Sequence, residues 1–224
     1  MPGDLNLAFT KAQNYCWDES QGYVFGGYGS PGFDCSGLVS KCLYEAGFNI
    51  PNYHIGTWDL TSLGDNRLQL AGFTEYRHTS SNPVTLQNGD IVVMNHTPFG
   101  RGGHAFFYAE NVRGYTDPSG RSNNIGALTR AKIEASSTRT SGYQYPNDPG
   151  TIPGDINNPS GTADYPRNTT GAHWEVWVHA FTNLYGGYDP SDPTDYIHVY
   201  RYPGGLIDDG VLGALLLYKL AITR

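Results

Sequence analysis

The chain has 224 residues, 38% of them hydrophobic, and a formal net charge of −7 at pH 7. This length fits one domain, with or without an appendage, and the apolar side chains are enough for a core. The negative charge argues against a nucleic-acid partner, which normally calls for a basic face. Three cysteines, an odd number, do not describe a disulfide framework.

The N-terminal 17 residues predict a helix and no secretory signal. Met1 to Leu7 has neither the basic region nor the apolar region of a signal peptide. Apolar side chains then recur at helical spacing over Leu5 to Trp17, which indicates a short amphipathic helix.

The stretch from Tyr23 to Phe48 organises the rest of the chain. Its first half is rich in glycine, and Asp34 then precedes a helical repeat of apolar side chains that ends at Gly47. Cys35 therefore falls in the first turn of a buried helix. Free backbone N–H groups and the helix dipole favour a thiolate there, which makes Cys35 a candidate nucleophile.

The alternative to this interpretation is a purely structural role for Cys35. A cysteine is often only a small core residue. Cys42 lies on the same helix face as Cys35 and fits that description, as does Cys16.

Further elements follow along the chain. One helical piece is expected within residues 55–70, and the periodicity predicts strands at 90–94, 105–109, 132–137, 173–181 and 196–202, the last closing the sheet. Residues 138–171 are rich in glycine and proline. They could form one side of the substrate groove or be an insertion with no role in binding. The apolar tail after residue 206 is too short for a membrane span and predicts a helix docked on the domain or between subunits.

Several motifs together resemble one family. Residues 23–27 (Tyr-Val-Phe-Gly-Gly) and 32–39 (Gly-Phe-Asp-Cys-Ser-Gly-Leu-Val) resemble the nucleophile segment of the NlpC/P60 cysteine peptidases, which cut peptidoglycan stem peptides. Residues 86–93, 103–108 and 133–137 resemble later motifs in family order. The resemblance covers about residues 8–137.

This resemblance implies an α+β, papain-like fold, in which N-terminal helices, including the nucleophile helix, pack on a central antiparallel sheet. We expect a catalytic domain at 1–205 with insertions at about 111–130 and 138–171, followed by an apolar helix at 206–224. The related CHAP domains are similar in using an acid near the histidine.

The resemblance also implies a catalytic set. His104, which opens a strand after Gly103, corresponds to the family histidine that pairs with the nucleophile. Glu134 stands where many members have a histidine, and a carboxylate can orient His104 equally well. The alternative for Glu134 is a strand residue facing solvent, and Asp34, its competitor, suits a helix cap.

Other residues are candidates for binding substrate. The N–H of Cys35 could stabilise an oxyanion, and the resemblance implies a second donor, since Tyr23 matches a family tyrosine that approaches the site. Ser36 and Trp58 could contact substrate, although Ser36 with Gly37 also suits close packing of the helix beside the sheet, and Trp58 also suits the core. His173 and His179 share a strand face, but no cysteine or carboxylate recurs at ligand spacing, so we expect no metal and no cofactor.

The resulting hypothesis is a peptidoglycan hydrolase that cleaves a stem-peptide amide after D-glutamate through Cys35, His104 and Glu134. The alternatives are an N-acyl amidase or transferase with the same pair, or a non-catalytic virion protein. The acid orienter, the absent signal and the insertions favour a phage or prophage lysin. Such an antimicrobial enzyme would lie in the virion or host cytoplasm before acting on the wall. The expected partner is bacterial peptidoglycan, with self-association through the C-terminal helix as a further option.

Overall fold

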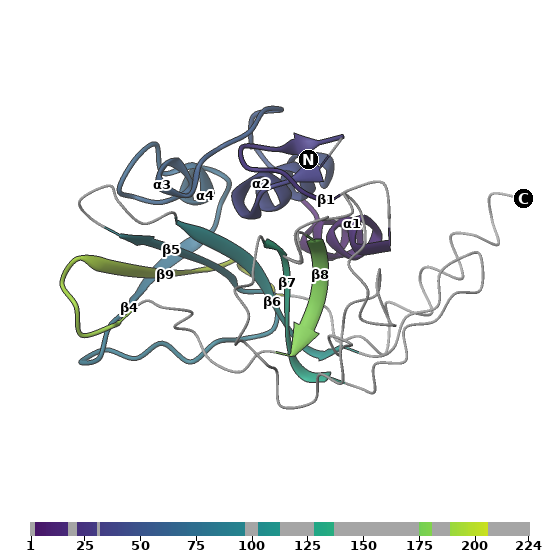
Figure 1. Cartoon of the computed structure of the whole chain (residues 1–224). Helices are drawn as coiled ribbons and strands as arrows, with labels where there is room; N and C mark the ends of the chain where they lie inside the picture. The colour runs from purple at the N-terminus through teal and green to yellow at the C-terminus, as the bar shows by residue number, and fades with distance from the viewer. Residues whose placement is uncertain are drawn as a thin grey trace, which may run out of the picture.

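The computed structural model describes residues 3–17, 22–30, 32–96, 103–112, 128–136, 175–180 and 189–205. Within these ranges the helices lie on one side of a nine-stranded, mostly antiparallel sheet (Figure 1). This arrangement agrees with the expected α+β class. The predicted insertion at 138–171 and the predicted helix at 206–224 lie outside the described residues, so both stay predictions.

Two helices form where the apolar periodicity predicts them. Helix α1 spans Leu5–Trp17 and helix α2 spans Cys35–Glu45. Asp34 caps α2 because its Oδ1 accepts a hydrogen bond of 2.6 Å from the backbone N–H of Gly37. Gly47, at φ +81°, adopts the left-handed conformation that ends the helix at low cost.

The connection between α2 and the sheet differs from the single helical piece expected. It holds two short helices, α3 (Thr57–Leu60) and α4 (Arg67–Leu70), separated by Asn66 in the left-handed conformation. Strand β4 (Thr74–His78) follows. Sequence analysis missed this strand because four of its five residues are not buried, which leaves no alternation of apolar side chains to read.

The sheet has the order β2-β3-β1-β8-β7-β6-β5-β9-β4. Its long strands are β5 (Ile91–His96), β6 (His104–Val112), β7 (Leu128–Ser136), β8 (Glu175–Ala180) and β9 (Asp195–Arg201). Three two-residue strands, β1 (Gly22–Tyr23), β2 (Tyr28–Gly29) and β3 (Gly32–Phe33), come from the glycine-rich stretch before α2.

One sequence expectation about the sheet was wrong. Strand β9 does not close the sheet, because it pairs with β5 on one side and with β4 on the other. Most of the insertion expected at about 111–130 falls between Val112, where β6 ends, and Leu128, where β7 begins, and lies outside the described residues, so it stays a prediction.

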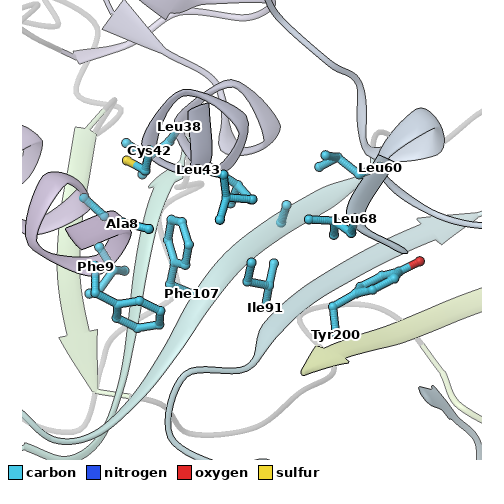
Figure 2. Close-up of a cluster of buried hydrophobic side chains, with 14 of the residues drawn as sticks. Ala8, Phe9, Leu38, Cys42, Leu43, Leu60, Leu68, Ile91, Phe107 and Tyr200 are labelled. Carbon is cyan, nitrogen blue, oxygen red and sulfur yellow. The ribbon is translucent and has the colours of Figure 1, made fainter. Parts of the chain in front are cut away.

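The main core lies between the helices and the sheet (Figure 2). Phe9 of α1 meets Phe107 of β6 edge to face, with ring centroids 4.9 Å apart. Leu38, Cys42 and Leu43 of α2 are fully buried in the same cluster. This packing fixes α2, and with it Cys35, against the strands that follow.

The other face of the sheet is also apolar. A second cluster consists of Val92, Met94, Phe106, Tyr108 and Ile197. Strands β5 and β6 are therefore buried on both faces, which explains why both read as nearly unbroken apolar runs. In the part of the chain that the structure describes, no helix is long and apolar enough to cross a membrane.

We expect Phe107→Ala to lower the free energy of unfolding by about 3–5 kcal/mol, because it leaves a cavity beside Phe9 in a closely packed core. Leu70→Ala, at a side chain that is 61% exposed, is the control and should change stability by less than about 0.5 kcal/mol. Urea unfolding followed by circular dichroism measures both. Equal losses for the two variants would contradict this assignment of the core.

Candidate active site

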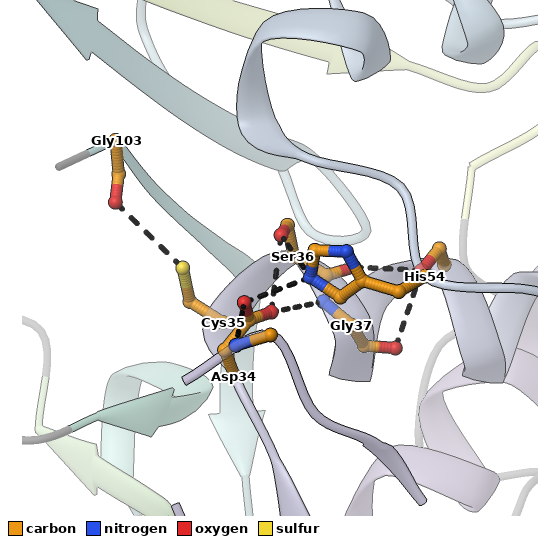
Figure 3. A network of polar contacts seen from close by, with 8 residues as sticks. Asp34, Cys35, Ser36, Gly37, His54 and Gly103 are labelled. Carbon is orange, nitrogen blue, oxygen red and sulfur yellow. Dashed lines mark hydrogen bonds and ion pairs between the residues drawn. The ribbon is translucent and has the colours of Figure 1, made fainter. Parts of the chain in front are cut away.

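Cys35 lies at the point where α2 begins and β6 begins. Its thiol is buried, and Sγ lies 3.8 Å from the carbonyl oxygen of Gly103, to which it donates (Figure 3). The first intrahelical hydrogen bond of α2 runs from the N–H of Leu38 to the carbonyl of Asp34. The N–H of Cys35 therefore precedes the first helical hydrogen bond and has no acceptor within the helix.

Gly103 makes this close approach possible. A Cβ at this position would lie 1.9 Å from Oγ1 of Thr57 and 2.8 Å from Oδ1 of Asn95. The amide of Asn95 also donates to the carbonyl of Thr57 at 3.1 Å. The beginning of α3 and the end of β5 thus hold the start of β6 in place, and a larger residue than glycine would displace it.

His104 and Glu134 form the next contact of the site. Nε2 of His104 lies 2.6 Å from Oε2 of Glu134, whose side chain is 2% exposed. Phe107 pairs with Ile133 in the β6–β7 ladder, and this register sets Glu134 opposite Phe106, two residues from His104. The alternative of a solvent-facing Glu134 is therefore wrong. Since Nε2 is bound to Glu134, Nδ1 is the ring nitrogen left for Cys35, with which His104 also shares a hydrogen bond.

The imidazole of His104 is a stronger base than usual. Burial lowers its pKa, but the charge of Glu134 and the hydrogen bonds with Cys35 and Glu134 outweigh burial and raise the pKa to about 9. His104 is consequently an imidazolium at neutral pH. Because the folded pKa lies above the ordinary 6.5, the stabilisation from this charge is complete below pH 6.5 and is lost as the pH rises through about 9.

Lys132 is a neighbour of the site that the sequence analysis missed. Its Nζ lies 3.3 Å from Oε2 of Glu134 and 5.1 Å from the ring centroid of Phe106. The buried carboxylate is thus shared between two cations. Lys132 and Glu134 are two residues apart on β7, and this spacing could have signalled that they share a strand face.

Three predicted binding residues have described surroundings. Tyr23 pairs with Phe33 in the β1–β3 ladder and is packed against the main core. The Ser36 hydroxyl donates to Oδ1 of Asp34 at 3.1 Å. Trp58, on α3, is half-buried, and its ring lies against Gly64. Their substrate contacts stay predictions.

Gly37 does pack closely, but its neighbour differs from the one expected. A Cβ on Gly37 would lie 1.9 Å from the carbonyl oxygen of Gly27. The close approach is therefore between α2 and the glycine-rich turn before it, and not between α2 and the long strands of the sheet.

His54 is the second residue that sequence reasoning missed, because a histidine in a loop is expected to lie at the surface. Its Nε2 lies 2.8 Å from Oδ2 of Asp34 and 3.4 Å from the hydroxyl of Ser36. The residues are 20 positions apart. No local pattern joins them, so nothing in the sequence marked His54.

Two polar residues at the end of β5, Asn95 and His96, have partners other than His104. His96 pairs with Asp195, and Asn95 donates to Thr57. Across the described ranges, no three His, Cys, Asp or Glu side chains are grouped so as to hold a metal ion. His173 and the side chain of His179 lie outside what the structure describes.

A cysteine in the first turn of a helix beside a histidine is an arrangement that can serve an activated thiol nucleophile. A family model described as the NlpC/P60 family matches residues 20–147, more than half of the chain. The protein therefore belongs to the NlpC/P60 family, whose members are typically cysteine peptidases or amidases. A comparison with curated proteins found no match.

We expect Glu134→Gln to lower wall-lysis activity by at least about tenfold at pH 8, because the imidazolium loses the charge that stabilises it. The alkaline limb of the pH profile should move from about 9 toward 6.5. Glu134→His should recover part of the loss. Turbidity of purified walls between pH 5 and 10 measures these effects.

The matched control is Glu110→Gln, the same change at the far end of β6, where Glu110 accepts a hydrogen bond from the Tyr108 hydroxyl. It should leave the pH profile unchanged. Equal rates for the Gln, His and Ala variants of Glu134 would remove this residue from the site.

Proposed function

We propose that the protein is a peptidoglycan hydrolase, a cysteine endopeptidase that cleaves a stem-peptide amide with Cys35, His104 and Glu134. The observation that carries this proposal is the contact of His104 with both Cys35 and a buried carboxylate. Membership of the NlpC/P60 family supports a peptidoglycan substrate. Cleavage after D-glutamate rests on the family resemblance.

In the proposed first step, the Cys35 thiolate attacks the carbonyl carbon of the scissile amide. The N–H of Cys35, in the first turn of α2, donates to the oxyanion that forms. The His104 imidazolium then protonates the leaving amine as the C–N bond breaks. An acyl-thioester remains on Cys35, and the neutral imidazole is left bonded to Glu134.

In the second step, neutral His104 takes a proton from water, whose oxygen attacks the thioester carbon. The C–S bond breaks, the carboxylic acid leaves and the thiolate–imidazolium pair is restored. Glu134 receives no proton in this cycle, and it orients the ring and stabilises its charge. Lys132 Nζ lies 3.3 Å from the same carboxylate and places a second positive charge beside it.

Two alternatives use the same pair. An N-acyl amidase would cut a different amide bond, and a transferase would replace water by an amine. The intact contact between Cys35 and His104 favours either over a non-catalytic virion protein. A phage or prophage lysin stays our proposal for the origin, on the sequence grounds given above.

We expect Cys35→Ala and Cys35→Ser to abolish wall lysis while the circular dichroism spectrum stays unchanged. Cys42→Ala should keep most of the activity, because Cys42 is fully buried in the core and burial raises the pKa of its thiol well above the usual range. Cys16→Ala is a second control.

Mass analysis of the soluble fragments decides the bond that is cut. New amino groups on the stem peptide, with the glycan–peptide link intact, support the endopeptidase. Release of whole stem peptides from the glycan indicates an amidase, and a joined peptide indicates a transferase. Lysis by a Cys35→Ala variant would overturn the enzyme assignment.

A further inference from the structure

The Asp34 carboxylate lies directly beside the nucleophile. Asp34 is 6% exposed and precedes Cys35 in the chain. Its Oδ1 accepts from the N–H of Gly37 at 2.6 Å and from the Ser36 hydroxyl at 3.1 Å. Its Oδ2 accepts from the N–H of Gly26 at 3.0 Å. A buried anion in this position opposes a second negative charge on the neighbouring sulfur.

His54 supplies the cation that this carboxylate needs. Nε2 of His54 lies 2.8 Å from Oδ2 of Asp34, and Figure 3 shows the carboxylate between the imidazole ring and the side chain of Cys35. The charge that acts on His54 is that of Asp34, and Ser36 adds a hydroxyl at 3.4 Å. The pair is therefore close to neutral when both groups are ionised.

The chain on either side of His54 links the two halves of the site. His54 binds Asp34 at the start of α2, and three residues later Thr57 packs against Gly103 at the start of β6. The connection between them is short. The contact of His54 with Asp34 therefore also affects the distance between Cys35 and His104.

We propose that His54 is a positioning residue for the nucleophile, whose imidazolium neutralises the Asp34 carboxylate and fixes residues 54–57 between Cys35 and His104. It touches no reacting atom and acts through Asp34. The inference rests on the proposed role of Cys35 as the nucleophile. It adds His54, from a segment that the triad does not use, to the ionisable side chains of the site.

The protonation states of the pair support this role. The hydrogen bond with Asp34 raises the pKa of His54 above 6.5 against a smaller opposing effect of burial. Burial raises the pKa of Asp34, but the hydrogen bonds from His54, Gly37 and Gly26 together lower it below its usual value. Since the folded pKa of His54 is raised, its contribution is complete below pH 6.5 and is lost as the pH rises through the raised value.

The test is the rate of Cys35 alkylation by iodoacetamide at pH 6 in the full chain, followed by mass spectrometry. His54→Gln can still donate to Asp34 but carries no charge, and alkylation should slow by about fivefold, the size of one partly exposed ion pair. In an Asp34→Asn background the same change should have less than about a twofold effect, because no anion remains to be neutralised. A purely structural role would give equal slowing in both backgrounds and would overturn the proposal.

Two further variants complete the design. Arg67→Gln also removes one positive charge, from α4, where Arg67 pairs with Asp65, and it should leave alkylation unchanged. If His54→Gln does not fold, a charge-conserving variant decides. The second decisive variant is His54→Arg, which keeps a positive charge beside Asp34 and should be alkylated at the wild-type rate to within about twofold. A clear slowing would contradict the proposal.

This readout needs no wall substrate, so it separates the two proposals. A wild-type protein that lyses no walls, together with a slowed His54→Gln variant, would reject the proposed function and keep the role of His54. Wall lysis by the wild type with an unchanged alkylation rate in His54→Gln would do the reverse.

Discussion

The hydrogen bonds to Asp34 are the constraint on which the rest of the site depends. This one buried carboxylate joins the turn that contains Gly26, the first turn of α2 and the connection that contains His54. Each of these segments places a hydrogen-bonding nitrogen against this carboxylate. Because the partners converge on a residue adjacent to Cys35, the cost of burying a charge is offset at the point where the nucleophile must be held still.

The second half of the site is held by a different kind of constraint, which is close packing. Gly103 has no side chain, and Thr57 and Asn95 occupy the space that one would need. The strand that carries His104 therefore starts next to the thiol of Cys35. A charged network fixes the side of the site that carries Asp34 and Cys35, whereas a steric fit fixes the side that carries His104. Residues 54–57 connect the two sides.

The sequence predicts the parts of the fold and of the site that depend on local patterns of residues. The helices at Leu5–Trp17 and Cys35–Glu45 were predicted with their bounds, since their periodicity and caps are local. His104 and Glu134 were named from motif resemblance, and the structure brings them together. His54 was missed because its partner Asp34 lies 20 positions away. Lys132 was missed although it lies two residues from Glu134 on the same strand face. Strand β4 was missed for want of an apolar pattern.

The β6–β7 pair separates the chemistry from the hairpin connection. His104 opens β6 and Glu134 lies near the end of β7, so both are at one end of the ladder, whereas Val112 and Leu128 pair at the other. Nine residues of strand span about 30 Å. The chain between Val112 and Leu128 can therefore lengthen or shorten over evolution without shifting the histidine relative to its carboxylate, and this end of the protein is free to diversify while the reacting groups keep their register.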